Sequence, residues 1–132
     1  MDKLLDIYKL FYRCVLEYAA PVWSGSLNAI FRQDIERVQQ NEFSVICGIY
    51  GKPYESLLEE MEQDTLLLRR EKLRLKFANK CLKKEKIKSW FPEGVSTRSG
   101  LHYFNDDYKT KRFSNSAIPY MSRLLNRSIS KI

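Results

Sequence analysis

The residues best suited to chemistry lie in the string YFNDDY, residues 103–108, where an aromatic and one spacer precede Asp106 and Asp107. Polymerases that copy RNA hold magnesium with a carboxylate pair of this kind, since magnesium prefers oxygen ligands. A working pair sits at a turn between apolar strands, and a third aspartate joins it to hold two metal ions. Here the pair is followed by basic residues: Lys109, Lys111 and Arg112. We therefore interpret the two aspartates as a solvated turn and expect no catalytic residue and no metal site.

Other reactive side chains are sparse and widely spaced. The cysteines, Cys14, Cys47 and Cys81, are more than thirty residues apart, and His102 is the single histidine. This spacing fits neither a disulfide framework nor a zinc motif. The segment CGIYGKP has two glycines but lacks the GK[ST] ending of a phosphate-binding loop. We expect three small thiols in or near a core and no cofactor or small-molecule substrate.

Charge is distributed unevenly along the 132 residues. Residues 1–64 contain six Lys and Arg against eleven Asp and Glu, a net charge of −5, whereas residues 65–132 contain seventeen against five, a net charge of +12. Such polarity predicts a basic half that meets a polyanion, with a solvated basic face as the alternative. No apolar run is long enough to span a membrane, and the charged N-terminus is unlike a secretory signal. We expect an intracellular protein, cytoplasmic or nuclear and not secreted.

Apolar spacing of three and four predicts an all-α fold, a small bundle of three to four helices. The first helix runs from Asp2 to Ala20 before Pro21; Leu4, Ile7, Tyr8, Phe11, Val15 and Tyr18 form its apolar face. The second begins at a Ser24 or Ser26 cap and ends at Gly48, and a short third begins at Pro53. The fourth is capped by Asp64 or Thr65 and continues to Phe91. Apolar faces at 4–15, 27–46 and 66–82 should bury one another.

The fourth predicted helix combines an apolar side with a basic stripe. At 100° per residue, six basic residues fall within an arc of about 120°. These residues are Arg69, Lys72, Lys76, Lys80, Lys83 and Lys86. The apolar side contains Leu67, Leu75, Ala78, Cys81 and Leu82. The stripe is about 25 Å long at 1.5 Å per residue and could track several phosphates. A solvated lysine face, an acidic protein partner and an anionic membrane are the alternatives.

A series of segments brings a protein family into view. IYKLFYRCVLEYAAPVW, DIERVQ, YESLLEEM, RREKLRLKFANKCLK, TRSG, YKTKRFSNSAIPY and SRLLN follow one another in this order from about Leu4 to Asn126. The series resembles the region downstream of the catalytic palm in reverse transcriptases of non-LTR retrotransposons, the LINE-like and jockey-like elements. In that family the endonuclease, the fingers and the palm with its metal-binding aspartates precede this region. The resemblance therefore implies a thumb and a C-terminal extension, without the polymerase active site.

The resemblance implies a division of the chain and a role for its basic residues. Residues 1–92 correspond to a helical thumb-like module, and residues 93–132 to a basic extension with a short helix near 120–126. The implied role is non-catalytic: to hold an RNA or DNA primer–template duplex by its backbone against a palm. The binding residues would be the basic stripe together with Lys109, Lys111 and Arg112. The alternatives are a helical interaction module that packs on a palm, and a degenerate element fragment without a selected function.

Overall fold

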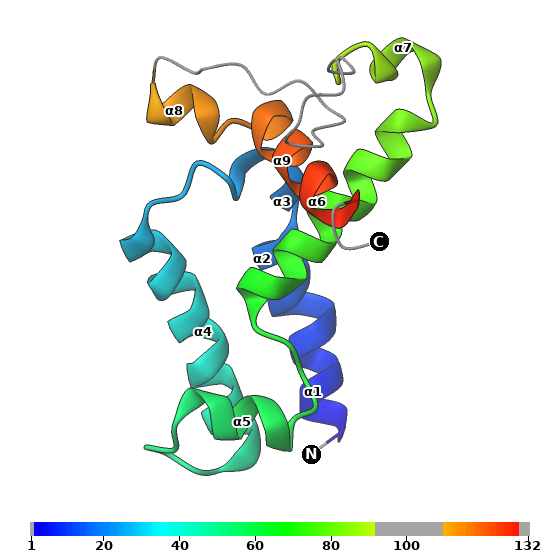
Figure 1. Ribbon diagram of the computed structural model, residues 1–132. Helices are drawn as coiled ribbons and strands as arrows, with labels where there is room; N and C mark the ends of the chain where they lie inside the picture. The colour runs from blue at the N-terminus through cyan, green and yellow to red at the C-terminus, as the bar shows by residue number, and fades with distance from the viewer. Residues whose placement is uncertain (1, 92–109, 130–132) are drawn as a thin grey trace. The chain divides into compact units, whose positions relative to one another are not determined.

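The computed structural model describes residues 2–91 and 110–129, and every regular element in these ranges is a helix (Figure 1). The expected all-α fold is confirmed, since the described residues contain no strand. Their contacts form two compact units. Unit 1 comprises Met1–Ala20 and Leu27–Arg70, and unit 2 comprises Pro21–Ser26 and Glu71–Ile132. No helix of the described residues is long and apolar enough to cross a membrane.

The first helix of unit 1 contains a π-helical turn. Helix α1, Asp2–Ile7, continues through the π-helix η1, Tyr8–Tyr12, into α2, Arg13–Glu17, with helical dihedrals at both junctions (Figure 1). A π turn accommodates an extra residue and so changes which side chains follow on a given face. The helix ends where Ala19 adopts a positive φ of 49°, ahead of the short α3, Ala20–Trp23.

The expected apolar face of the first helix is mostly exposed. Of the six residues predicted to face the core, only Tyr8 is buried. The others are all exposed: Leu4, Ile7, Phe11, Val15 and Tyr18. The prediction that this face packs against the other helices is therefore wrong for unit 1. After the π turn, the side chains of Arg13 and Glu17 face inward. They form hydrogen bonds with Gln63 and Arg69, respectively.

Helix α4, Ala29–Cys47, has well-formed caps at both ends. The Asn28 side chain accepts a hydrogen bond from the Phe31 N–H at 2.9 Å, and Gly48 takes the left-handed conformation, with φ of 66°. Gly48 as the end of this helix is confirmed. The predicted cap at Ser24 or Ser26 is wrong. The Ser24 hydroxyl accepts from the Arg74 guanidinium, and the Ser26 hydroxyl donates to a backbone carbonyl. Helix α5, Tyr54–Glu60, begins directly after Pro53, as expected.

The core of unit 1 lies between the first helix, α4 and α5. Tyr8, Phe43, Leu57 and Met61 form a buried cluster. The rings of Tyr8 and Phe43 meet edge to face, with centroids 5.1 Å apart and an interplanar angle of 70°. This arrangement is the favoured geometry for an aromatic pair. This small cluster anchors the first helix through Tyr8, with partly buried Leu5 packed beside it.

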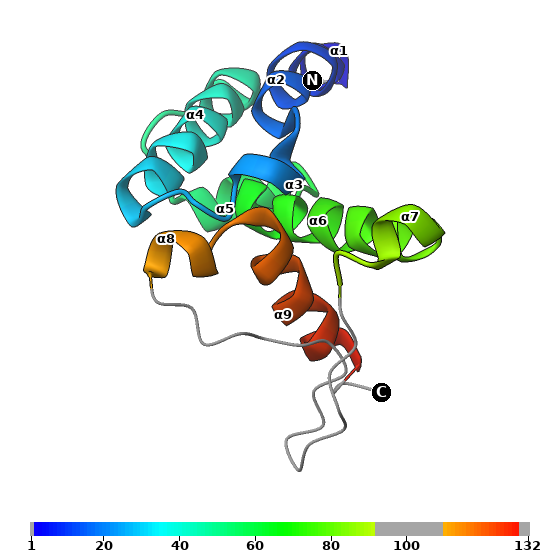
Figure 2. The same ribbon diagram turned by 90° about the horizontal axis from the view of Figure 1, so that it is seen from above.

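Helix α6, Leu66–Leu82, begins in unit 1 and continues in unit 2. In unit 2 it is followed by α7, Glu85–Lys88, α8, Lys111–Ser114, and α9, Ala117–Ile129. Helix α9 packs across α6 (Figure 2), and the buried cluster that joins them is Ala78, Cys81, Phe91, Met121 and Leu125. The helix expected near 120–126 is confirmed and is longer at both ends.

Gly25 explains how the segment before α4 fits into unit 2. A Cβ atom at this position would lie 2.6 Å from the Asn115 carbonyl oxygen, closer than atoms can approach without a shift of the backbone. Glycine therefore permits residues 21–26 to pack directly against the chain that follows α8.

Candidate nucleic-acid interface

The N-terminus of α6 is fixed by a carboxylate from α4. The backbone N–H groups of Leu66 and Leu67 donate to the Glu36 side chain at 3.1 and 2.6 Å, and the Tyr54 hydroxyl donates to it at 2.7 Å. Thr65 completes the cap by accepting from the Leu68 N–H at 3.2 Å, so the expected cap at Asp64 or Thr65 is confirmed. A carboxylate here satisfies otherwise unpaired donors and complements the positive end of the helix dipole.

Two arginines occupy the buried side of α6. Arg70 is 2% exposed and its Nη2 lies 3.3 Å from the Glu36 carboxylate; burial lowers the pKa of its guanidinium. Arg74, in unit 2, is 3% exposed. Its guanidinium lies 3.9 Å from the centre of the Tyr120 ring and donates to the Ser24 hydroxyl. Buried arginines of this kind need such partners, because an unpaired buried charge is costly.

Sequence reasoning missed both buried arginines. The available signal was a spacing of four residues on one side of the helix, shared by Leu66, Arg70, Arg74 and Ala78. The predicted apolar side is correct for Ala78 and Cys81, which are buried, but Leu67 is 43% exposed. The opposite side of α6 is exposed and contains the lysines.

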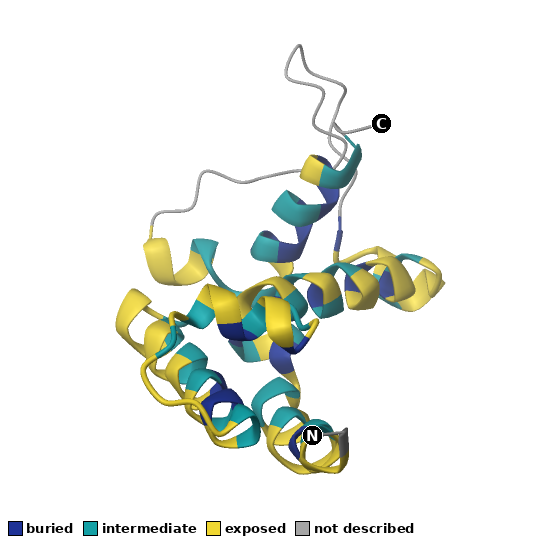
Figure 3. Ribbon diagram, turned by 90° about the horizontal axis from the view of Figure 1, so that it is seen from below, coloured by how far each residue is buried: buried dark blue, intermediate teal, exposed yellow. Residues whose placement is uncertain are grey.

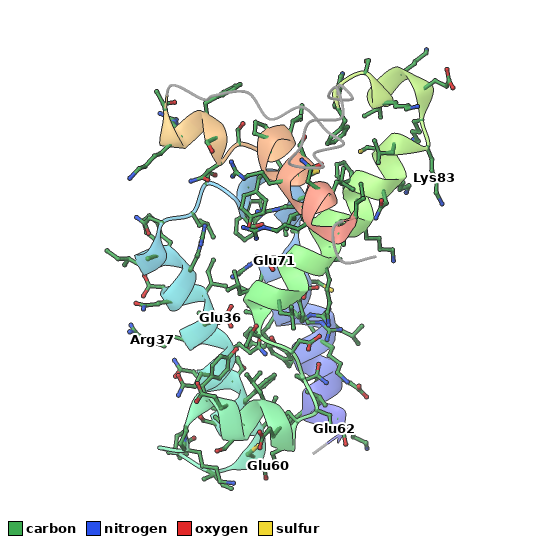
Figure 4. The ribbon with its side chains drawn as sticks, viewed as in Figure 1. Glu36, Arg37, Glu60, Glu62, Glu71 and Lys83 are labelled. Atoms are coloured by element: carbon green, nitrogen blue, oxygen red, sulfur yellow. The ribbon has the colours of Figure 1, made fainter. Side chains whose placement is uncertain are left out.

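Lys72, Lys76 and Lys80 are exposed at successive four-residue steps of α6. Each step advances about 6 Å along the axis and turns about 40° around it, so the three side chains form one gently winding row. They line a surface hollow of about 560 Å³ in unit 2. Its described lining also includes Leu75, Asn79 and Lys83. This part of the predicted basic stripe is therefore a row of exposed lysines in the structure. Lys83 lies at the C-terminal end of the row (Figure 4).

Arg69 is held by a carboxylate of the first helix. Its Nε and Nη2 both donate to the Glu17 carboxylate, the latter at 3.2 Å, and the two side chains are 27% and 14% exposed. The hydrogen bond to Glu17 raises the pKa of the Arg69 guanidinium. The Glu17 carboxylate offsets the charge of this guanidinium and occupies two of its hydrogen-bond donors. We therefore omit Arg69 from the proposed interface.

Lys86 lies beyond a break in the helix. The prediction that one helix runs to Phe91 is wrong: α6 ends at Leu82, Lys84 is extended with φ of −105°, and α7 follows. The reason is the burial of Phe91, which packs in the cluster of Ala78 and Cys81. A straight helix would place residue 91 about 20 Å from residue 78 along the axis. The straight stripe therefore ends near Lys83.

The remaining predicted residues lie nearer the C-terminus. Lys111 and Arg112 are exposed on α8, whose first turn is capped by Thr110, and they do not line the hollow. Lys109, Asp106 and Asp107 fall outside the described residues. Within the described ranges, no group of three or more His, Cys, Asp or Glu side chains could hold a metal ion.

Comparisons of the chain with known protein families, with curated proteins and with solved structures give no match.

Proposed function

We propose that this chain is a non-catalytic part of a non-LTR retrotransposon reverse transcriptase, from the region after the palm, which holds primer–template nucleic acid by backbone contacts. The assignment to this family rests on the resemblance of the ordered segments between about Leu4 and Asn126. The observation that carries the binding role is the exposed row of Lys72, Lys76 and Lys80 on a helix whose other side is fixed by burial. A fixed helix holds its cations in place without the entropy cost of ordering a loop.

The chemistry of the row suits phosphates better than bases. Lysine ammonium groups are flexible point charges that contact phosphate oxygens without geometric selectivity. Such contacts position a protein on nucleic acid and carry no sequence information. From Lys72 to Lys83 the row extends about 17 Å, shorter than the 25 Å expected from sequence. We therefore propose three to four phosphate contacts, compared with up to six for the full predicted stripe.

The charge of each unit supports this assignment. Unit 1 contains eight Lys and Arg against eleven Asp and Glu, a net charge of −3, whereas unit 2 contains fifteen against five, a net charge of +10. A strongly basic unit raises the local concentration of a polyanion and speeds its association. Nucleic acid should therefore engage unit 2 through α6 and not unit 1.

Replacement of Lys72, Lys76 and Lys80 by Gln tests the proposal. Glutamine is a good helix former, so the fold should persist on this exposed surface. Binding to duplex DNA or an RNA–DNA hybrid should weaken. The slope of log affinity against log salt should fall by roughly 2.7, about 0.9 for each lost duplex phosphate contact. Fluorescence anisotropy over a series of salt concentrations measures both quantities, and circular dichroism verifies the helix content.

The matched control replaces Lys3 and Lys9, two basic residues of unit 1, by Gln. This variant should keep the parent affinity and salt slope. If the α6 triple variant binds as the parent does, the lysines are only a solvated face and the binding role fails. If parent binding does not weaken as salt rises, backbone contact is the wrong mechanism.

A second candidate, an interaction module that packs on a palm, is favoured by the exposed apolar face of the first helix. Phe11 is 66% exposed, Val15 74% and Tyr18 79%. Docking through these side chains would be driven by apolar burial and would hardly depend on salt. The salt series above therefore distinguishes the two roles, since phosphate binding weakens steeply under the same conditions.

A further inference from the structure

The exposed apolar side chains of the first helix lie between Leu4 and Tyr18, about four helical turns, and most of this helix is coloured as exposed or intermediate (Figure 3). Besides the five residues that were expected to be buried, they include Leu10, which is 67% exposed, and Cys14, a free exposed thiol. We define the N-face by its members: Leu4, Ile7, Leu10, Phe11, Cys14, Val15 and Tyr18. A contiguous apolar surface of this length is characteristic of an interaction site.

We propose that a second copy of this chain covers the N-face, so that the isolated protein forms a weak antiparallel two-fold dimer. The area of the face fits this occupant. An aromatic side chain presents about 150–250 Å². Phe11 and Tyr18 together therefore expose about 300 Å² at their observed exposed fractions. With the aliphatic members, two facing copies would bury about 1,000 Å² in total, the lower limit for a specific interface.

The charges that flank the N-face also suit a second copy. Arg13 donates to Gln63 at 3.4 Å and Glu17 is bonded to Arg69, so both are turned toward the inside of unit 1. The fully exposed charges of this helix that the structure describes are Lys3 and Asp6, which have opposite signs, and Lys9 is half-exposed. So few charges give little attraction to nucleic acid and little repulsion between identical copies.

The position of these two charges selects the antiparallel arrangement. Lys3 and Asp6 lie at one end of the face, near Leu4. A parallel pair would place Lys3 against Lys3 and Asp6 against Asp6, whereas an antiparallel pair separates the like charges by about 20 Å. A two-fold axis through the middle of the face makes the contact self-complementary and closed at two copies. It also sets Phe11 opposite Phe11, in the most buried part of the interface.

Sedimentation velocity of the full chain, from low micromolar to several hundred micromolar, tests the pairing. The parent should shift from monomer to dimer over this range, because interfaces at the small end of the size range are weak. Replacement of Phe11 and Val15 by Gln should raise the dissociation constant by more than about tenfold. Both side chains are largely exposed in unit 1, so the monomer should keep its helix content.

The matched control replaces Phe31 and Val45 of α4 by Gln, one Phe and one Val that are 57% and 56% exposed in the same unit. This variant should dimerise as the parent does. Equal weakening in both variants would mean unspecific hydrophobic association, and the proposal would fail. A parent that stays monomeric throughout the range would also overturn it and would leave the N-face to another protein.

Cys14 supplies a second, independent measurement. A short bis-maleimide should link two copies through Cys14, and Cys14→Ser should abolish this product, because Cys81 is buried and Cys47 is half-buried. Crosslinking should fall in the Phe11 and Val15 variant, in which the thiol remains. Persistent crosslinking in Cys14→Ser would place the contact elsewhere. The lysine triple variant should dimerise normally, which separates this inference from nucleic-acid binding.

Discussion

The first helix and α6 are both amphipathic, but they use their apolar sides in opposite ways. In the first helix the side richest in apolar residues is exposed, and Tyr8 alone is buried from it. In α6 the buried side contains Arg70 and Arg74 beside Leu66 and Ala78. The difference shows that hydrophobic spacing identifies faces but does not determine which face is covered. Coverage depends on partners, such as the Glu36 carboxylate that meets Arg70, and these come from distant parts of the sequence.

Removal of the Glu36 carboxylate should have the largest effect on α6. Glu36→Ala would leave the buried Arg70 without its ion-pair partner and Leu66 and Leu67 without an acceptor. Loss of one partner of a buried ion pair costs about 3–5 kcal/mol. We expect a decrease of this size in the free energy of unfolding, measured by urea denaturation followed by circular dichroism.

Arg37 provides the control for this substitution. It is the neighbour of Glu36 on α4, points away from the rest of unit 1 (Figure 4), and forms an ion pair with Asp34 at 3.5 Å. Its side chain is 68% exposed. Exposed pairs contribute about 0–1 kcal/mol, so Arg37→Ala should change stability little. Equal effects of the two substitutions would show that Glu36 does not anchor α6.

Buried Tyr8 and half-buried Tyr54 should respond oppositely to removal of their hydroxyl groups. The Tyr54 hydroxyl donates to Glu36, so Tyr54→Phe should destabilise by about 1.5–3 kcal/mol. The Tyr8 hydroxyl is buried and has no hydrogen-bond partner among the described residues. Tyr8→Phe removes an unsatisfied group from the first helix, and we expect a gain of about 1 kcal/mol. Urea denaturation at pH 7 measures both changes. A loss of stability in Tyr8→Phe would reveal a partner for that hydroxyl.

The same tyrosines predict a decrease in stability at alkaline pH. Burial raises the pKa of Tyr8, and burial together with the hydrogen bond to Glu36 raises the pKa of Tyr54. The folded pKa lies above the unfolded value of about 10 in each case. Their contribution is therefore fully present below pH 10 and is lost as pH rises above it. The free energy of unfolding should fall between about pH 10 and 12, less steeply in Tyr8→Phe. Equal slopes in parent and variant would contradict this assignment.

The sequence predicts the elements of this fold well where a local signal determines them. Gly48 and Thr65 mark helix ends because glycine tolerates a left-handed backbone and threonine caps free N–H groups. The helix near 120–126 was expected from the resemblance and is present as part of α9. The π turn at Tyr8–Tyr12 has no comparable local signal, and it changes which residues of the first helix face inward.

The candidate interface was predictable in part. Lys72, Lys76 and Lys80 follow from helical spacing, and they are exposed as expected. The end of the straight row near Lys83 was not predictable, since it depends on the burial of Phe91 among residues of α6 and α9. The pairing of Arg69 with Glu17, 52 positions earlier, was hidden for the same reason. Such contacts are properties of the tertiary fold and not of local spacing.

The smallest predicted effect concerns Arg69, where the first helix and α6 meet within unit 1. Because its guanidinium is held by Glu17, Arg69→Gln should leave the slope of log affinity against log salt unchanged, whereas Lys76→Gln should lower it by about 0.9. Glu17→Gln sharpens the comparison. It releases the guanidinium without removing it, so the slope should rise toward one additional phosphate contact. Anisotropy titrations on one duplex compare all three variants, with circular dichroism to verify that each is folded. A drop of about 0.9 in Arg69→Gln would show that nucleic acid displaces Glu17, and the interface would then begin at residue 69.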